Sequence, residues 1–464
     1  MITERFDYLV IGSGPAGQRA AIQAAKLGLT VGLVERNTTI GGACLHTGTV
    51  PSKTLREAVL YLTGWRQRGF YGRSYRVKER ITAEDLMQRL DMTVRHEIEV
   101  LQHKLYRNRV QSIPGAARFL DPHCVHVTMY DGSEREYRAG KFLIATGTVP
   151  SHPPGIPFDG ERVLDSDSIL NLKVLPRSMV VVGAGVIGVE YASIFNALDI
   201  EVTLVDSRTG LLDFLDREIV DELVHHLRDR GMNVRLGEKV QAIESDGTGP
   251  IRVRLGSGRQ VRADIALVTA GRQGATADLG LDAAGLEVDE RGRLTVDEHF
   301  RTAVPHIYAA GDVVGFPSLA STSMEQGRHA ACHAFGAPTA LDFQTFPFGI
   351  YAVPEMSVVG MTEQEALAAG IAYETGTARF RETSRGQILG LREGLLKLMF
   401  RLDDRRLIGV HIVGEGATEL VHIGQAVIAL GGGLDYLVNA VFNYPTLAET
   451  YKVAALNAFN RFPA

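Results

Sequence analysis

The residues best suited to chemistry begin with a glycine-rich turn, GSGPAG, starting at Gly12. Gly12 permits a tight turn, Gly14 lets the main chain approach a pyrophosphate, and Gly17 lets the following helix pack closely on the preceding strand. An apolar run precedes the turn, a helical pattern follows it, and the next apolar run ends on Glu35. A carboxylate at that place can accept hydrogen bonds from a ribose. The motif therefore predicts a dinucleotide site.

A second glycine-rich turn repeats this plan later in the chain. It reads GAGVIG from Gly183, with Gly185 and Gly188 in the equivalent positions. The apolar run that follows its helical pattern ends on Asp206, 23 residues after Gly183, and the same interval separates the first glycine and the acid of the first motif. Two such motifs predict two bound dinucleotides and an α/β fold with two Rossmann-like domains.

Three other apolar runs end in small residues, as expected of strands that reach a cofactor. They are KFLIATG at 141–147, ADIALVTAG at 263–271 and IYAAGD at 307–312. The last run ends on Asp312, whose carboxylate can accept a hydrogen bond from a cofactor hydroxyl. Upstream of these runs, apolar residues recur every three or four positions over 86–105, which predicts a long amphipathic helix packed on the core.

Length and composition limit the class of protein. The 464 residues suffice for about three domains, and 49 Lys+Arg against 54 Asp+Glu give a net charge of −5, so no basic excess indicates nucleic acid or an acidic membrane. The longest nearly apolar run, 179–189, is far shorter than the roughly 18 residues of a membrane span. The N-terminus lacks the charge order of a signal peptide, and three cysteines are too few for a disulfide framework. We expect a cytoplasmic protein without a bound metal.

Five segments together resemble the class I pyridine nucleotide-disulfide oxidoreductases, the flavoprotein family of lipoamide dehydrogenase, glutathione reductase and mercuric reductase. They are GSGPAG with Glu35, GGACLHTGTVPSK at 41–53, GAGVIGVE at 183–190, AAGD at 309–312 and FNYPTLAE at 442–449. The resemblance covers essentially the whole chain. It implies FAD on the first glycine turn, NAD or NADP on the second, and a C-terminal α+β interface domain. It also implies a homodimer, or a larger homo-oligomer, whose active site is completed across the subunit boundary.

The resemblance also implies domain boundaries and further cofactor-binding residues. An FAD-binding domain would comprise two parts at 1–150 and 272–340, with an NAD(P)-binding domain at 151–271 and an interface domain at 341–464. Beyond the glycines and acids of the two turns, the expected cofactor-binding residues are Pro15, Ala16, Arg36, Gly41, Gly42, Ala43, Cys44, Lys53, Thr146, Gly147, Val186, Ile187, Gly271, Arg272, Gly311 and Asp312.

The chain departs from the disulfide reductases of this family at two places. Where they have two cysteines five residues apart beside the flavin, this chain has Cys44 and then Thr49. A threonine hydroxyl cannot form a disulfide or store two electrons. Where they have a His-Pro pair followed by a glutamate as the base for the thiols, this chain has Tyr444-Pro445 and Glu449. A phenol titrates near a pH of about 10, so Tyr444 is a poor base at neutral pH and mostly a hydrogen-bond donor.

The residues that the family uses around the flavin ring are retained. By the resemblance, Lys53 lies near the flavin N5 and pairs with Glu190. A cation at that place stabilises the negative charge of reduced flavin, and a buried lysine needs a carboxylate partner. Without the motif match, a solvated Lys53 and a Glu190 on a helix surface would be the simpler interpretation.

The second motif indicates both nicotinamide nucleotides. Asp206 is placed to accept a hydrogen bond from the free 2′-hydroxyl of NAD, and Arg208, two residues later, can contact the 2′-phosphate of NADP. The presence of both suits a site that accepts the two nucleotides in turn. The alternative for Arg208 is a solvated loop charge.

These features predict FAD-dependent hydride transfer between NADPH and NAD⁺, with the two nicotinamides as substrates that bind in turn and with no redox disulfide. Lys53, Glu190, Cys44, Tyr444 and Glu449 are the candidate catalytic residues. One alternative is a reductase like dihydrolipoamide dehydrogenase that handles a disulfide substrate through Cys44 alone. Another is a non-catalytic FAD protein that senses redox state.

Overall fold

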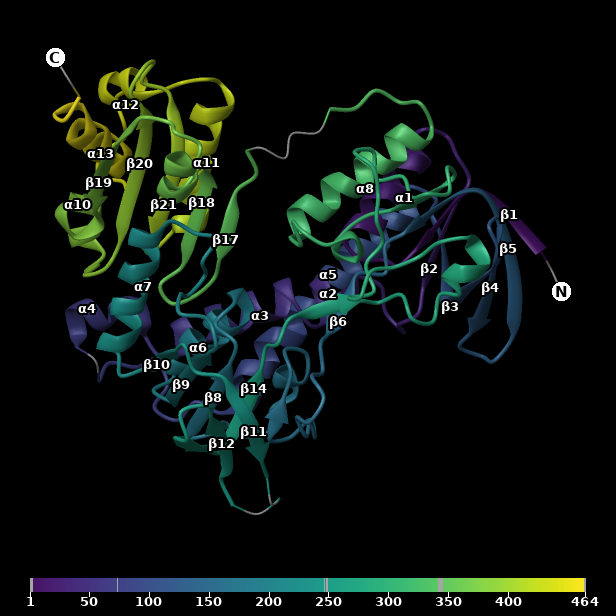
Figure 1. Ribbon diagram of the computed structural model, residues 1–464, viewed down its shortest axis with the longest axis horizontal. Helices are drawn as coiled ribbons and strands as arrows, with labels where there is room; N and C mark the ends of the chain where they lie inside the picture. The colour runs from purple at the N-terminus through teal and green to yellow at the C-terminus, as the bar shows by residue number, and fades with distance from the viewer. Residues whose placement is uncertain (1–2, 73, 246, 248, 341–344, 463–464) are drawn as a thin grey trace. The chain divides into compact units, whose positions relative to one another are not determined.

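The computed structural model describes residues 3–72, 74–245, 247, 249–340 and 345–462 (Figure 1). The parts of the expected domains at 1–2, 73, 246, 248, 341–344 and 463–464 lie outside the described residues. The chain forms two compact units, each assembled from three segments of sequence. The first unit takes its residues from 1–54, 87–151 and 270–341, and the second from 55–86, 152–269 and 342–464.

The first unit is built on a six-stranded sheet. Its strands are β1 (Thr3–Ile11), β2 (Val31–Glu35), β3 (Gln111–Asp121), β4 (Cys124–Met129), β5 (Glu134–Ile144) and β16 (Ile307–Ala309). β1 lies between β2 and β5 and is parallel to both. β3 is parallel to β2, and β16 is parallel to β5. β4 joins β3 and β5 as an antiparallel strand. The carboxyl ends of β1, β2, β5 and β16 therefore meet at one edge, where the predicted site residues follow them.

Helices and a short ribbon complete the first unit. The helices are α1 (Pro15–Lys26), α2 (Gly42–His46), α8 (Ala320–Ala334) and the 3-10 helices η3 (Leu281–Ala284) and η4 (Asp312–Val314). The start of α3 (Thr49–Leu62) and most of α5 (Ala83–Arg107) also belong to this unit. The ribbon is the strand pair β6 (Thr148–Pro150) and β15 (Arg272–Gly274). α1 and α8 lie side by side (Figure 1), so closely that a Cβ on Gly327 would clash with the main chain of Ala16. The sheet packs a core that includes Phe6, Leu9, Ile113, Phe119, Phe142 and Ile307.

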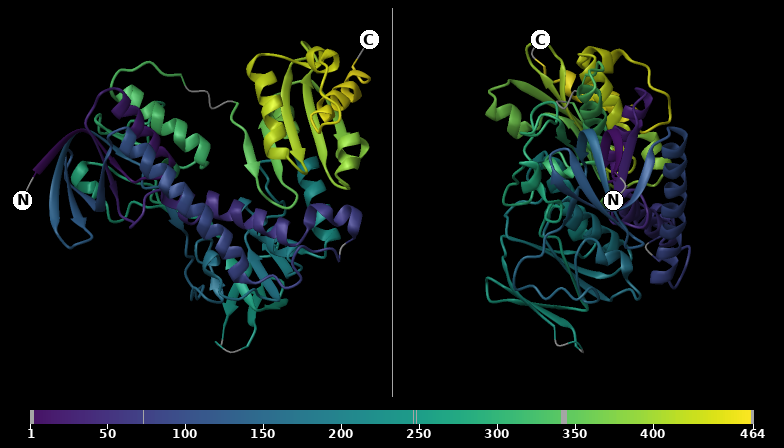
Figure 2. Two further views of the ribbon diagram at one scale, coloured as in Figure 1. Left: turned by 180° about the vertical axis from the view of Figure 1, so that it is seen from behind. Right: turned by 90° about the vertical axis from the view of Figure 1, so that its right-hand side faces the viewer.

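The predicted amphipathic helix is confirmed. It is α5, the longest helix among the described residues, and it is continuous over its whole length (Figure 2). Four residues of its apolar stripe are buried, namely Leu86, Leu90, Leu101 and Leu105. Val94 and Ile98, in the middle of the stripe, are only half-buried.

The second unit contains a parallel sheet in the order β10-β9-β8-β14-β7. Its strands are β7 (Val163–Leu164), β8 (Ser178–Val182), β9 (Glu201–Asp206), β10 (Asn233–Leu236) and β14 (Ile265–Val268), with the helices α6 (Val186–Ala197) and α7 (Arg217–Asp229). A three-stranded antiparallel sheet of β11 (Val240–Glu244), β12 (Ile251–Leu255) and β13 (Gln260–Ala263) follows β10 in the chain. The segment 55–86 adds η1 (Trp65–Gln67) and α4 (Arg68–Tyr71), and η2 (Ser168–Asn171) precedes β8.

The prediction of a single strand over 263–271 is wrong, because the run is divided between two strands. Ala263 ends β13 and Ile265 begins β14, and the two strands belong to different sheets. Asp264 separates them because its carboxylate accepts hydrogen bonds from the main-chain N–H groups of Arg177, at 2.7 Å, and Ser178, at 3.2 Å. The chain therefore leaves one sheet and enters the other at this carboxylate.

The rest of the second unit is an antiparallel sheet in the order β17-β18-β21-β20-β19, against which α11 and α13 pack. Its strands are β17 (Phe348–Ile350), β18 (Met356–Gly360), β19 (Tyr373–Arg379), β20 (Leu395–Arg401) and β21 (Leu407–Val413). Its helices are α9 (Glu363–Ala368), η5 (Phe380–Glu382), α10 (Ser384–Ile388), α11 (Ala417–Ala429), α12 (Leu434–Asn439) and α13 (Glu449–Phe459). The predicted α/β fold, with two βαβ nucleotide-binding folds and a C-terminal α+β region, is confirmed.

Candidate active site

The first glycine-rich turn joins β1 to α1, and its three glycines have different roles. Gly12 has a φ of +104°, and a Cβ there would clash with the carbonyl group of Ala145. A Cβ on Gly17 would clash with the carbonyl oxygen of Gly12. Main-chain packing therefore requires both glycines. A Cβ on Gly14 would meet nothing within 4 Å, so the main chain at Gly14 borders open space, as the approach of a pyrophosphate requires.

Glu35, the last residue of β2, holds this turn in place. Its buried carboxylate accepts hydrogen bonds from the main-chain N–H of Ser13, at 3.0 Å, and from the Ser13 hydroxyl. The Ser13 Oγ in turn accepts the N–H of Gly41 at 2.8 Å. A Cβ on Gly42 would lie 2.9 Å from Gly14 Cα, which is too close for two carbon atoms. The predicted residues of the first motif and of the 41–53 segment are thus brought together at one sheet edge.

The second glycine-rich turn joins β8 to α6 and has the same construction. Gly183 has a φ of +105°, and a Cβ there would clash with Thr269. A Cβ on Gly188 would clash with the carbonyl oxygen of Gly183, whereas a Cβ on Gly185 would meet nothing within 4 Å. The carboxylate of Asp206 accepts the main-chain N–H of Ala184, as Glu35 accepts that of Ser13 in the first turn. Both turns therefore offer open main chain at their second glycine.

Asp206 and Arg208 form a two-point ion pair beside the second turn. Arg208 Nε lies 3.0 Å from Asp206 Oδ1, and Nη2 lies 2.7 Å from Oδ2. Burial opposes ionisation of Asp206, but the hydrogen bonds from Arg208 and from the N–H of Ala184 outweigh it and lower the pKa of the carboxyl. The Arg208 side chain is 47% exposed. A carboxylate and an accessible guanidinium therefore stand together at the end of β9.

Asp312, three residues after β16, is a half-buried acid of the first unit. Burial raises the pKa of its carboxyl, while the charge of Arg272 opposes the rise. Among the described residues, its oxygens have long contacts with two hydroxyls, 3.4 Å to Thr148 Oγ1 and 3.5 Å to Ser323 Oγ. Thr146 lies two residues before Thr148, and its hydroxyl is buried with no hydrogen-bond partner among the described residues. These acceptors and donors have capacity left for the polar groups of a bound dinucleotide.

Cys44 lies in α2 and faces the start of α3. Burial raises the pKa of its thiol, and a hydrogen bond with the Thr49 side chain and the charge of Lys53 only partly oppose this. Cys44, Cys124 and Cys332 are all free thiols. A neutral thiol is a weak nucleophile. The neighbour of the Cys44 sulfur at the start of α3 is thus a hydroxyl, which cannot take part in disulfide chemistry.

Lys53 and Glu190 are placed by different helices. Lys53, the fifth residue of α3, is half-buried, and its Nζ donates to Ser52 Oγ at 3.2 Å. Glu190, on α6, is 3% exposed, and its Oε1 accepts the main-chain N–H of Tyr351 at 2.8 Å. Lys53 belongs to the first unit and Glu190 to the second, and their pairing stays a prediction.

Tyr444 and Glu449 lie before and at the start of α13. Tyr444 is 64% exposed, and its hydroxyl forms a hydrogen bond with Ser384 Oγ. Glu449 Oε2 is buried and has no hydrogen-bond partner within the part of the chain that the structure describes. The tyrosine hydroxyl is therefore directed to α10, and the carboxylate of Glu449 keeps an unused acceptor.

The remaining predicted cofactor-binding residues lie on the same turns or at strand ends. Pro15 and Ala16 begin α1, Val186 and Ile187 begin α6, and Ala43 lies in α2. Gly147 and Gly271 have φ values of +69° and +98° and border open space. Arg36 is exposed after β2, and Arg272 donates from Nε to Thr148 Oγ1 at 2.8 Å. Gly311, with a φ of +84°, lies beside Ala16. Their contact with a cofactor stays a prediction.

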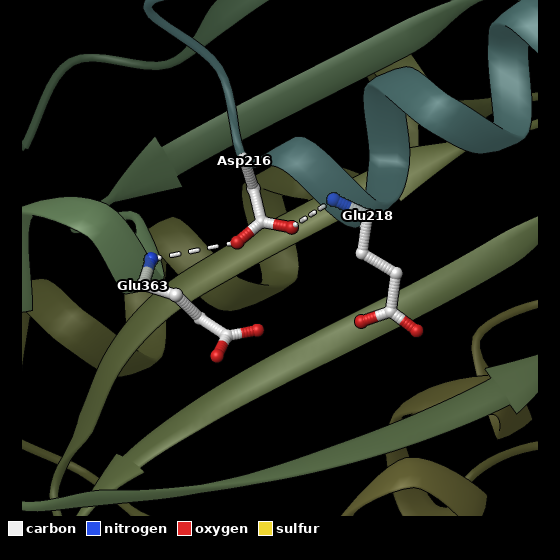
Figure 3. A group of neighbouring side chains, drawn as sticks. All are labelled: Asp216, Glu218 and Glu363. Carbon is white, nitrogen blue, oxygen red and sulfur yellow. Dashed lines mark hydrogen bonds between the residues drawn. The ribbon is translucent and has the colours of Figure 1, made fainter.

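One group of carboxylates has the spacing of a metal site. Asp216, Glu218 and Glu363 come together between α7 and α9 (Figure 3). The ammonium group of Lys397 lies among them, 2.9 Å from Asp216 Oδ1 and 3.0 Å from Glu218 Oε2, and it also contacts Glu363. A lysine therefore already supplies the positive charge at this place.

Among the described residues, no helix is long and apolar enough to cross a membrane.

Comparison with protein families gives two matches that together cover most of the chain. The model for pyridine nucleotide-disulphide oxidoreductases matches residues 6–327, and the model for the dimerisation domain of the same family matches residues 346–455. The chain belongs to the pyridine nucleotide-disulphide oxidoreductase family. The resemblance recognised in the five sequence segments is thereby confirmed, and it extends over both units.

Relatives within this family are similar over their full length. A soluble pyridine nucleotide transhydrogenase of Mycobacterium bovis is 55% identical over 460 residues, which is 99% of this chain and 98% of the relative. A protein of the same name from Salmonella paratyphi C is 43% identical over 460 residues, or 98% of each chain. At such identity over whole chains, the two relatives share the fold and the domain order.

Solved structures of the family have the same fold. The crystal structure of LpdA from Mycobacterium tuberculosis is 29% identical, with a TM-score of 0.89 over 98% of this chain and 99% of that one. The HOCl-induced flavoprotein disulfide reductase RclA from Escherichia coli is 28% identical, with a TM-score of 0.86 over 97% of this chain and 99% of that one.

Two side chains of this oxidoreductase fold were not expected from the sequence. Ser13 links Glu35 to Gly41, and Gln326 of α8 accepts the N–H of Gly311 through Oε1 at 2.8 Å. A hydroxyl between the first two glycines of the motif is a signal that could have drawn attention to Ser13. Gln326 has no such signal, because its role depends on the packing of α8 against α1.

Proposed function

We propose that this oxidoreductase is a soluble pyridine nucleotide transhydrogenase that moves a hydride between NADPH and NAD⁺ with FAD as its cofactor. The observation that carries the proposal is the combination of two matched nucleotide turns with a free Cys44 that has Thr49, and no second cysteine, five residues later. A disulfide reductase needs a second sulfur beside the first, whereas transfer between nicotinamides does not. The names of the two full-length relatives support the same reaction.

The first unit has the features that FAD requires. Gly14 leaves the space for a pyrophosphate, Glu35 is fixed at the end of β2 for a ribose, and the Thr146 hydroxyl and the Asp312 carboxylate have unused hydrogen-bonding capacity. When bound, FAD would supply a two-electron carrier. Lys53 would place a positive charge beside it, and the buried Glu190 would balance that charge. Cys44, as a neutral thiol, would pack against the cofactor as a small apolar group.

The second unit would bind the nicotinamide nucleotides in turn. The open main chain at Gly185 would admit the pyrophosphate, and Asp206 would accept the 2′-hydroxyl of NAD⁺. For NADPH, Arg208 would turn from Asp206 to the 2′-phosphate, which its exposure allows. One site that receives both nucleotides gives a ping-pong pattern, because the first product must leave before the second substrate enters.

The match of residues 346–455 to a dimerisation domain supports a homodimer, and larger homo-oligomers are compatible with it. Large apolar side chains are exposed in this region at Leu430, Tyr436, Val441 and Tyr444. Burying such residues in a subunit interface would remove apolar surface from water. We infer that Tyr444 and Glu449 then complete the active site of the partner subunit. The domain boundaries at 150, 271 and 340 are part of the same proposal.

Arg208 is expected to govern the choice of nucleotide. Arg208→Ala should weaken NADPH binding by about 1–3 kcal/mol, since a charge-assisted pair is lost and the Asp206 carboxylate is left facing the 2′-phosphate. NADH should bind as before, because its 2′-hydroxyl can donate to the freed carboxylate. Arg254→Ala is the matched control, as Arg254 is also half-exposed and paired with a carboxylate, 2.9 Å from Glu244. Equal losses for both nucleotides would remove Arg208 from the site.

The test of the proposed reaction compares acceptors with NADPH as the donor and without oxygen. NAD⁺ or a nicotinamide analogue should be reduced rapidly, while oxidised glutathione and lipoamide should be poor acceptors. Cys44→Ser should keep most of the NAD⁺ reduction, because no step needs the sulfur. Faster turnover with a disulfide, or loss of all activity in Cys44→Ser, would instead support a one-cysteine reductase. Absence of turnover with every acceptor would support a non-catalytic FAD protein.

A further inference from the structure

Three residues that follow β17 in the second unit, Tyr351, Ala352 and Val353, belong to the connection between β17 and β18. Tyr351 is half-buried. Ala352 is fully buried and Val353 is 2% exposed. The main-chain groups of all three residues bond to side chains from two helices outside this sheet. Because buried main-chain groups must find partners, these side chains and this segment fix each other in place.

Two of the side chains come from α6. Glu190 Oε1 accepts the N–H of Tyr351 at 2.8 Å. One turn later, the buried Ser193 Oγ accepts the N–H of Val353 at 3.0 Å and donates to the carbonyl oxygen of Glu190 at 2.9 Å. The Ser193 hydroxyl thus links Val353 to the main chain of Glu190. The proposed function uses the carboxylate of this glutamate.

The third side chain comes from α3, the helix that begins with Thr49 and carries Lys53. Arg56 lies one helical turn after Lys53, and its side chain is 4% exposed. Its Nε donates to the carbonyl oxygen of Ala352 at 2.9 Å, and its Nη1 lies 2.8 Å from Glu57 Oε1. The guanidinium is therefore held at both ends and keeps α3 tied to the segment.

From these contacts we infer that Ser193 and Arg56 are positioning residues for hydride transfer, acting through the 351–353 segment on the helices that carry Glu190 and Lys53. The inference rests on the proposed function in one respect, the use of Lys53 and Glu190 beside the flavin. A carboxylate with a fixed main-chain donor stays in one rotamer, and a fixed helix keeps the lysine at one distance from the reacting ring. A displacement of about 1 Å at such a site costs on the order of 10²-fold in rate.

The test uses the FAD-loaded full-length protein and the variants Ser193→Ala and Arg56→Met. Three properties are measured: amide hydrogen exchange at 351–353, the flavin midpoint potential, and the rate of flavin reduction by NADPH in the absence of NAD⁺. Ser193→Ala should speed exchange at Tyr351 and Val353, shift the potential, and slow reduction by about 10- to 100-fold. The Kd for NADPH should stay unchanged. Ser193→Thr keeps the hydroxyl and should restore most of the rate.

A matched control separates positioning from a general loss of packing. Thr302 is a buried residue of the first unit whose Oγ1 donates to the carbonyl oxygen of Ile307 at 2.8 Å and accepts the N–H of Val304 at 3.2 Å. Thr302→Ala removes a hydroxyl with the same bonding pattern and should leave the potential and the reduction rate unchanged.

A double-mutant cycle tests whether Ser193 works through Glu190. If it does, Ser193→Ala should add little to the effect of Glu190→Gln. Two results would overturn the inference. One is a double variant whose loss of rate equals the product of the two single losses, and the other is a Ser193→Ala protein with the rate and the flavin potential of the wild type. Failure of the proposed function gives a different result: flavin that NADPH reduces but NAD⁺ does not reoxidise. Exchange and potential need no substrate, so they decide the positioning role in that case as well.

Discussion

Lys53→Met is expected to slow flavin reduction by NADPH by about 10²–10³-fold, while FAD stays bound. This is the range for loss of one preorganised group that stabilises developing charge. Lys53 is half-buried near the start of α3, its Nζ donates to Ser52 Oγ, and its charge acts on the Cys44 thiol. Without the cation, reduced flavin loses stabilisation, so the midpoint potential should fall. Stopped-flow absorbance and a redox titration measure the two quantities.

Two further variants make the Lys53 result specific. Lys53→Arg keeps the positive charge and should keep the potential close to that of the wild type. Lys78→Met removes a lysine that is 46% exposed and pairs with Asp85 at 2.6 Å, and it should change neither quantity. If the potential of Lys53→Met equals that of the wild-type protein, Lys53 has no electrostatic role at the flavin.

Lys397→Met is expected to destabilise the protein by about 3–5 kcal/mol, the usual cost of leaving a buried charge without its partner. The Lys397 side chain is fully buried, and its Nζ contacts Asp216, Glu218 and Glu363. Asp216 is the N-cap of α7 and is 1% exposed, so its carboxylate cannot turn to water when the ammonium group is removed. Urea unfolding of the FAD-loaded protein at neutral pH measures the loss.

The pH dependence of this loss gives an independent check. In the wild-type protein burial opposes ionisation of Asp216, but His411 and Lys397 outweigh it and lower the pKa of the carboxyl. Ionised Asp216 thus contributes stability above its unfolded pKa of about 3.9, and that stability is lost as the pH falls through the lowered folded pKa. In Lys397→Met the pKa should rise instead. The difference in stability between the two proteins should shrink from pH 7 toward pH 4, and a difference that stays constant would contradict this account.

The local plan of the nucleotide sites was predictable from the sequence because it depends on neighbours in the chain. Gly12 and Gly183 need positive φ values, and Gly17 and Gly188 leave no room for a Cβ, so glycine spacing reports these constraints directly. The same holds for Asp206, whose place at the end of an apolar run fixes it beside its turn. The family and the fold followed from such local signals.

Contacts between distant segments could not be predicted in the same manner. Gln326 reaches Gly311 only because α8 packs on α1, and the Tyr444 hydroxyl bonds to Ser384, 60 residues earlier. Similarly, nothing in the sequence around Ser193 or Arg56 indicates that both bond to one segment near residue 352. The strand break at Asp264 has the same origin, since its partners lie 86 and 87 residues away. Such roles are set by tertiary packing, not by local pattern.

An anaerobic stopped-flow experiment with two sequential additions tests the proposed reaction most directly. The FAD-loaded protein is mixed with one equivalent of NADPH, and the flavin absorbance is followed until it stops changing; NAD⁺ is then added in the second mixing step. We predict that NADPH bleaches the flavin and that NAD⁺ restores its colour with formation of one equivalent of NADH, also in Cys44→Ser. A flavin that stays bleached after NAD⁺, but regains its colour when oxidised glutathione or lipoamide is added, would contradict the transhydrogenase proposal.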